Sequence, residues 1–157
     1  MRQAVRRKDR EITDIRRIEE ILSRAQAASV AFGGVGPYVI PLNYGFECVN
    51  GRFTLYFHGA QEGEKIDRVK ADPRAAFTAY AGNRVYGMDS GDYTSSFDCV
   101  CGSGVIRILE GEEKVRGLRI LMQHYVPGKE FSFSAAQLAA TCVMALEVES
   151  ISGKHHD

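Results

Sequence analysis

The chain has 157 residues, of which 45% are hydrophobic and 25% are charged, and its 20 basic and 20 acidic residues give a formal net charge of zero. This length predicts one domain whose core is large enough to need no disulfide or structural metal. The balanced charge argues against a general nucleic-acid binder, which would carry a basic excess. No segment approaches the ~18 consecutive apolar residues of a membrane span, so we expect no membrane association.

The first twelve residues are rich in arginine and lysine, and we interpret residues 1–12 as a solvated basic arm. No aromatic residue is present there to stack on a base, and no apolar segment typical of a secretion signal follows. We therefore expect a cytoplasmic protein with reduced thiols. Cys99 and Cys101 lie two apart, which on a strand puts both thiols on one face, and no metal-ligand spacing occurs.

In the first half of the chain, Thr13 is predicted to cap a helix, because its hydroxyl can accept from an unpaired amide. Asn50-Gly51 predicts a type I′ hairpin turn, in which both central residues need positive φ. A later helix carries Ile66 and stops before Pro73, because the residue ahead of a proline disfavours the helical conformation. We also expect the first helix to end at Ala25, and we expect strands over residues 30–32, 38–49 and 53–58.

The second half predicts further strands, with glycine-rich residues 82–95 as a loop and residues 151–157 as a tail. Gly102 and Gly104 interrupt one strand, as at a bulge or barrel corner. The pattern lacks regular β-α-β alternation, so we predict a mainly β (α+β) protein, a small antiparallel barrel with about six strands and four short peripheral helices. The remaining elements are strands over 75–81, 97–109 and 142–148, a helix over 112–125, and a helix capped by Ser134 through Ala140.

Lys65 is the leading candidate for ligand binding. It lies near the start of a predicted helix after a glycine-containing turn, where free amides and a positive side chain together favour a phosphate. The alternative is a surface lysine that pairs with Glu62 or Asp67. From spacing alone the two interpretations are equal.

Three other residues offer suitable chemistry, each with a structural alternative. His58, at the end of a strand, can donate to a phosphate or act as an acid, or it is simply a polar strand end. Asn43 offers a donor and an acceptor to the edge of a heterocycle, or it bonds the local backbone. Cys99 lies against a ligand or belongs to the core.

Five segments together resemble the pyridoxamine 5′-phosphate oxidase-like flavin-binding split barrels, specifically the nitroimidazole-resistance (Nim-type) branch. Each segment is short, but the five occur in order and span nearly the whole chain. They are RKDREI at 7–12, PYVIPLNYG at 37–45, LYFHGA at 55–60, GEKID at 63–67 and ISGK at 151–154.

This resemblance implies a six-stranded Greek-key split barrel that forms a homodimer, with FMN in two clefts at the interface. It also implies two groups of contacts. The ring would lie beside Pro41, Leu42, Asn43 and Tyr44. The phosphate end would be held by His58, Gly59, Ala60, Lys65 and Ile66, with the later strand adding Cys99 and Val100.

The chain departs from the family pattern at two positions. Where the family has Tyr-x-Ser-Val, this chain has Phe97 and Cys99, and its His-Gly-Ala at 58–60 replaces His-Ser-Ala. A thiol is a poorer hydrogen-bond partner than a hydroxyl, and glycine has no hydroxyl at all, so both changes predict weaker FMN binding.

The resemblance implies a reductase that passes electrons from a reduced nicotinamide to small planar acceptors such as nitroaromatic 5-nitroimidazoles, with His58 contacting the acceptor or relaying a proton. One alternative is a non-catalytic protein that stores or senses FMN, FAD, a deazaflavin or haem. A pyridoxine phosphate oxidase is a third possibility, although the arginine-rich contacts for a second phosphate are absent from the sequence.

Overall fold

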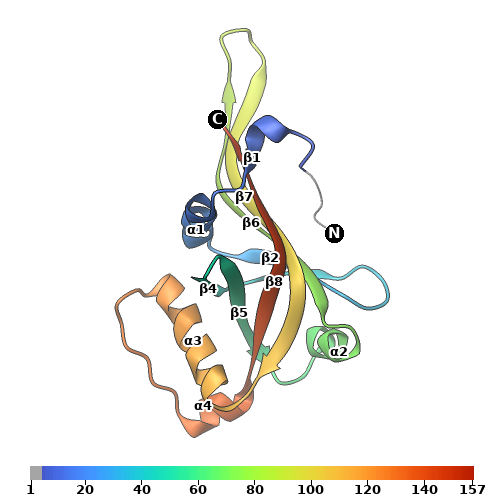
Figure 1. Cartoon of the computed structure of the whole chain (residues 1–157), viewed down its shortest axis with the longest axis vertical. Helices are drawn as coiled ribbons and strands as arrows, with labels where there is room; N and C mark the ends of the chain where they lie inside the picture. The colour runs from blue at the N-terminus through green and yellow to red at the C-terminus, as the bar shows by residue number, and fades with distance from the viewer. Residues whose placement is uncertain (1–4) are drawn as a thin grey trace.

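Eight β-strands and four α-helices make up residues 5–157, the part of the chain that the computed structural model describes (Figure 1). A short 3-10 helix, η1 (Lys8–Arg10), precedes them. The strands are β1 (Glu11–Ile12), β2 (Ala28–Phe32), β3 (Val39–Leu42), β4 (Gly45–Val49), β5 (Arg52–Ala60), β6 (Arg74–Gly87), β7 (Tyr93–Leu109) and β8 (Thr141–His156). The helices are α1 (Ile15–Arg24), α2 (Glu64–Ala71), α3 (Gly111–Tyr125) and α4 (Ala135–Ala140).

The strands form one antiparallel sheet in the order β3-β2-β6-β7-β8-β5-β4, and β1 adds to β8. β3 and β4 stand at opposite ends of this order, yet only Asn43 and Tyr44 separate them in the chain. The segment therefore bends from one end of the sheet to the other and brings the ends together, which gives a split barrel rather than a closed one. The predicted fold class is confirmed. The strand count is eight instead of six because residues 38–49 form two strands and β1 is additional.

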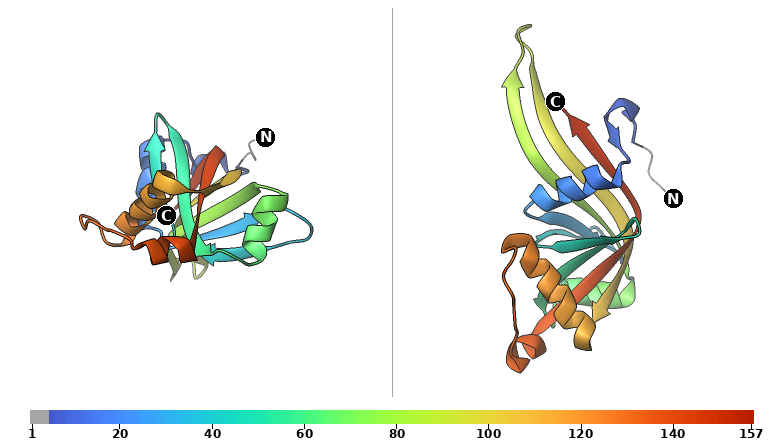
Figure 2. Two further views of the ribbon diagram at one scale, coloured as in Figure 1. Left: turned by 90° about the horizontal axis from the view of Figure 1, so that it is seen from below. Right: turned by 60° about the vertical axis from the view of Figure 1, so that its left-hand side comes forward.

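The main core fills the barrel and is closed by α1, whose Ile18, Ile21 and Leu22 are fully buried. Alternate residues of β5 (Phe53, Leu55 and Phe57) point into the same core, as period-two alternation requires. A second, smaller cluster lies under α3, the helix that Figure 2 shows against the other end of the sheet.

The hairpin turn at Asn50-Gly51 is confirmed, with φ of 51° and 76° at its two residues. The predicted cap of α1 at Thr13 is wrong. Asp14 is the N-cap, and its side chain accepts a 3.0 Å hydrogen bond from the amide of Arg16. A carboxylate one residue later satisfies the same kind of unpaired amide.

Of the predicted loop over residues 82–95, only residues 88–92 form a turn. β6 and β7 extend through the rest as a hairpin that projects from the body, visible at the top of Figure 1. Gly82, with a φ of 64°, lies in an irregularity between Ala81 and Arg84, so the glycine-rich composition produces a bulge and the ladder then resumes.

The predicted tail is also wrong, because β8 runs to His156 and pairs with β7 up to Phe97. The predicted solvated arm over residues 1–12 contains regular structure, because it includes η1 and β1, and β1 pairs with Lys154 and Gly153. Residues 1–4 lie outside the described part. No helix among residues 5–157 combines the length and apolarity that crossing a membrane requires.

Candidate functional site

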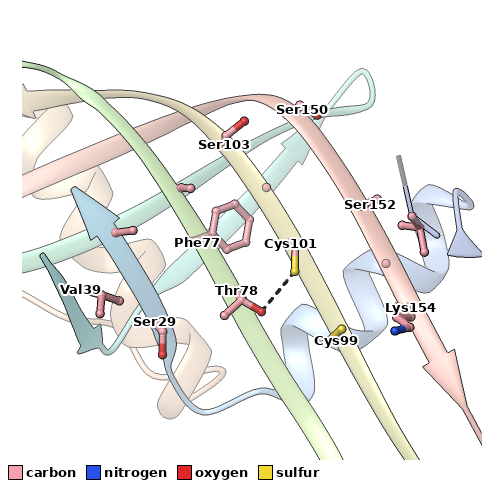
Figure 3. Close-up of a pocket in the computed structure, with 15 residues that line it drawn as sticks. Ser29, Val39, Phe77, Thr78, Cys99, Cys101, Ser103, Ser150, Ser152 and Lys154 are labelled. Atoms are coloured by element: carbon pink, nitrogen blue, oxygen red, sulfur yellow. Dashed lines mark hydrogen bonds between the residues drawn. The ribbon is translucent and has the colours of Figure 1, made fainter. Parts of the chain in front are cut away.

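A cavity of about 670 Å³ lies on the outer face of β2, β6, β7 and β8. Most of the side chains beneath it are small, as Figure 3 shows, so they leave the surface of the sheet open there. The strand register arranges the centre of this face as three rows that cross β6, β7 and β8. The rows are Tyr80–Cys99–Lys154, Thr78–Cys101–Ser152 and Ala76–Ser103–Ser150.

The two thiols of this face point the same way, as their spacing predicted, and both line the cavity. The Sγ of Cys101 lies 3.4 Å from the Oγ1 of Thr78. The hydrogen bond from Cys99, followed by that from Thr78 and the charge of Lys154, lowers the pKa of Cys101 to about 6 against the opposing effect of burial. The pKa of Cys99 is raised, because its thiol donates to Cys101 and is partly buried. The arrangement therefore favours ionisation of Cys101 over that of Cys99.

Lys154 supplies the cationic group of this face. Its Nζ lies 5.6 Å from the centre of the Phe97 ring, a cation–π contact, and its residue pairs with Cys99 across β7 and β8. Val39 of β3 bounds the cavity on one side, and Val5 contributes from the N-terminal segment.

The predicted ring-binding strand lies at the edge of the same sheet. Pro41 is exposed and pairs with Ser29, a lining residue of the cavity. Asn43 is exposed, and its Nδ2 donates a 3.4 Å hydrogen bond to the carbonyl of Gln26, which matches the backbone alternative for this residue.

The other two predicted ring-binding residues, Leu42 and Tyr44, have side chains that pack into or against the core. Tyr44 is 0% exposed and its hydroxyl donates a 2.5 Å hydrogen bond to the carbonyl of Leu22, so only its backbone is open to a ligand. Leu42 is half-buried against the core.

The predicted phosphate-binding residues lie elsewhere, where β5 ends and α2 begins. Gly59 pairs with Cys142, and a Cβ at Gly59 would lie 2.6 Å from Cε and 2.9 Å from Nζ of Lys65. The lysine side chain therefore passes directly over the glycine backbone. His58 and Ala60 are exposed beside it, and the side chain of Ile66 is buried in the core.

Positive charge gathers at this end of the sheet. Burial raises the pKa of the Cys142 thiol, and the charges of Lys114, Lys65 and Lys70 oppose that rise. Among residues 5–157, Lys65 forms no ion pair, so the predicted pairing with Glu62 or Asp67 is wrong and its ammonium is available.

The predicted residues thus occupy three places: the β3 edge, the β5–α2 end and the face of β7. Only Cys99 lines the cavity, and Val100 beneath it is fully buried in the core. Sequence reasoning missed Thr78, Ser152 and Lys154. The alternation of Ser150, Ser152 and Lys154 is a strand signal, but it lies in the segment interpreted as a tail.

Comparisons with known proteins identify relatives of this chain by sequence and by fold. A sequence model of the family described as pyridoxamine 5′-phosphate oxidase matches residues 14–155. No curated protein matches the chain significantly. The crystal structure of a candidate 5-nitroimidazole antibiotic resistance protein from Bacteroides thetaiotaomicron is similar, with 30% identity, a TM-score of 0.81 and coverage of 92% of this chain and 86% of that one.

Two more distant structures share the fold. A FAD and heme binding protein from Mycobacterium smegmatis has 22% identity, a TM-score of 0.79 and coverage of 94% of this chain and 74% of that one. A flavocytochrome from Azotobacter vinelandii has 19% identity, a TM-score of 0.79 and coverage of 99% and 73%. The match over residues 14–155 and the likeness to the Bacteroides protein show that this chain belongs to the pyridoxamine 5′-phosphate oxidase family, in its nitroimidazole-resistance branch.

Proposed function

We propose that this protein binds a flavin, FMN in particular, and reduces small planar acceptors. The observation that carries the proposal is the cavity on the outer face of the sheet, which small side chains keep open over four strands. Such an open surface leaves room for a planar aromatic ring. The serine and threonine hydroxyls beside it offer hydrogen bonds to the polar edge of the ring.

The residues present fit both ends of FMN. Lys65 has a free ammonium beside an exposed turn at the start of α2, and charge-assisted hydrogen bonds of this kind suit a phosphate. Gly63 precedes the helix with a φ of 134°, and its carbonyl accepts hydrogen bonds from the amides of Ile66 and Asp67, which leaves the amides of Glu64 and Lys65 at the start of the helix for an anion.

The two ends of this site are far apart in one chain. His58 pairs with Val143, eleven residues before Lys154 on β8, which is about 35 Å along a strand that rises about 3.3 Å per residue. That path is longer than an FMN molecule. We therefore propose a homodimer in which the phosphate end of one copy faces the open sheet surface of the other, so that each cleft uses both copies.

In this cleft the bound flavin would accept a hydride from a reduced nicotinamide and pass electrons to the acceptor. The chain supplies position and polarity. Lys65 anchors the phosphate, and the cavity face keeps the ring flat against β6 and β7. His58, exposed at the end of β5, can donate a hydrogen bond to an acceptor at the open side. Nitroaromatic 5-nitroimidazoles are the acceptors that the Bacteroides relative suggests.

The test begins with the visible spectrum of the purified protein and a titration of the flavin-free form with FMN. A protein that stays colourless and gains no flavin would refute the proposal. If FMN binds, it is reduced anaerobically with a nicotinamide and a 5-nitroimidazole is added. Return of the oxidised spectrum supports the reductase. We further propose a cytoplasmic location, where the four free thiols stay reduced.

A second candidate is a binding protein without turnover. It is favoured by Gly59, which removes a hydroxyl from the phosphate end, and by the FAD and heme binding named for one of the similar structures. Flavin, FAD, a deazaflavin or haem that binds stoichiometrically but is never reoxidised by nitro compounds or quinones would support this candidate over the reductase.

A further inference from the structure

The paired thiols of β7 line the cavity that we propose for the flavin ring, and their arrangement points to a further chemistry in the flavin-free protein. Cys99 and Cys101 both face the cavity of about 670 Å³, and their neighbours across the strands are a hydroxyl at Thr78 and an ammonium at Lys154. Two other cysteines differ: Cys142 is buried in the core, and Cys48 is half-buried outside this cavity.

We propose that Cys101 and Cys99 form a dithiol site that reacts with small disulfides entering the cavity, with Cys101 as the attacking thiol and Cys99 as the resolving thiol. Cys101 is the exposed member of the pair; its thiol donates to the Oγ1 of Thr78 at 3.4 Å, and the same hydroxyl can turn to donate to the thiolate. Cys99 is half-buried between Tyr80 and Lys154. The proposal concerns the flavin-free protein, in which the cavity is open to a small disulfide, and it does not require that flavin binds.

The reaction balances as a thiol–disulfide exchange. The Cys101 thiolate attacks one sulfur of a small disulfide, a new S–S bond forms, and one small thiolate leaves and takes a proton from water. The Cys99 thiol loses its proton to solvent and attacks the Cys101 sulfur, and the second small thiolate leaves. One small disulfide is reduced to two thiols, and the protein pair is oxidised by two electrons.

The backbone geometry of β7 determines how easily a disulfide between Cys99 and Cys101 would be reduced again. Two residues of a strand span about 6.6–6.8 Å between Cα atoms, at the upper limit of the about 4.4–6.8 Å that disulfides bridge. The bridge between Cys99 and Cys101 is therefore strained, and strained disulfides are readily reduced again. We expect the site to cycle between its two states rather than to lock the sheet.

The pKa of the attacking thiol supports this assignment. The hydrogen bond from Cys99 lowers the pKa of Cys101, whereas burial raises the pKa of the Cys48 thiol. Cys101 is also the more exposed of the two thiols. With limiting iodoacetamide at pH 6 we expect Cys101 to be alkylated at least about 5-fold faster than Cys48. Equal rates would overturn the assignment.

The decisive experiment treats the reduced, full-length protein with 4,4′-dithiodipyridine and maps tryptic peptides after an acid quench. Residues 85–107 form one tryptic peptide that contains only Cys99 and Cys101, while Cys48 and Cys142 fall in separate peptides. We expect this peptide to lose two hydrogens, to carry no pyridyl group and to resist alkylation. A peptide that carries one or two pyridyl groups would overturn the resolving role of Cys99.

Two matched variants separate the roles. Cys99→Ser keeps a hydrogen-bond donor beside Cys101, so it should react about as fast but retain one pyridyl group on Cys101. Cys101→Ser should slow the reaction of this peptide at least about 10-fold, because the remaining Cys99 thiol is half-buried and its burial disfavours the thiolate. If the two variants react at the same rate, Cys101 is not the attacking thiol.

Discussion

Replacement of Lys65 by alanine tests the phosphate end of the proposed site. The Lys65 side chain passes over Gly59 with its terminal atoms 2.6–2.9 Å from where a Cβ would stand, and it forms no ion pair within residues 5–157. Its removal therefore costs few contacts within the protein. A charge-assisted hydrogen bond contributes about 1.5–3 kcal/mol. Since about 1.4 kcal/mol is a factor of ten in affinity, Lys65→Ala should raise the Kd for FMN about 10- to 150-fold.

The assay compares FMN with riboflavin, which lacks the phosphate, by quenching of flavin fluorescence. Riboflavin affinity should change less than about 2-fold, because the ring contacts lie on the open sheet face. Lys70→Ala is the matched control: this exposed lysine lies later on the same helix and does not cover Gly59. Equal loss of FMN and riboflavin in Lys65→Ala would refute the reasoning and show that the lysine acts on the structure. An equal FMN loss in Lys70→Ala would show a diffuse effect of charge.

Two further predictions concern the sheet itself. A Cβ at Gly104 would lie 1.9 Å from the carbonyl oxygen of Glu147, so Gly104→Ala must move the backbone. In urea denaturation this variant should lower the free energy of unfolding by at least about 3 kcal/mol, whereas the control Ser103→Ala, at an exposed position, should lower it by less than about 0.5 kcal/mol. Near-equal stabilities of the two variants would contradict the register of β7 and β8. The hydrogen bond that His155 donates to the Asp98 carboxylate raises the pKa of His155 above its ordinary 6.5, so this contribution to stability is complete below pH 6.5 and is lost as the pH rises through the folded pKa. The free energy of unfolding should therefore fall between about pH 6 and 8 in the wild type and fall less in His155→Gln, and parallel pH profiles would rule out this coupling.

The local signals of the sequence were sufficient where the neighbouring residues decide the structure. Asn50-Gly51 specifies its hairpin because the turn itself needs positive φ. Ser134 caps α4 with a capping box that includes Gln137, since both partners lie within four residues. The apolar alternation of β5 likewise determined which side chains face the core.

Sequence reasoning failed where a strand depends on a distant partner. Residues 151–156 contain a single large apolar side chain, Ile151, so alone they resemble a tail, and only pairing with β7 makes them part of β8. The same holds for residues 82–87, whose ladder partner lies across the hairpin. Strand propensity is weak, and cross-strand contacts supply most of the stabilisation.

The sequence by itself determined the family, the split-barrel class and the shared face of Cys99 and Cys101, because these follow from motifs and from the period of two along a strand. Tertiary structure alone decided what surrounds those thiols. Thr78 comes from 23 residues away and Lys154 lies on the last strand, and neither is near Cys101 until β6, β7 and β8 are in register. Register depends on the fit of whole strands, so the chemistry of this face emerges only when the sheet has formed.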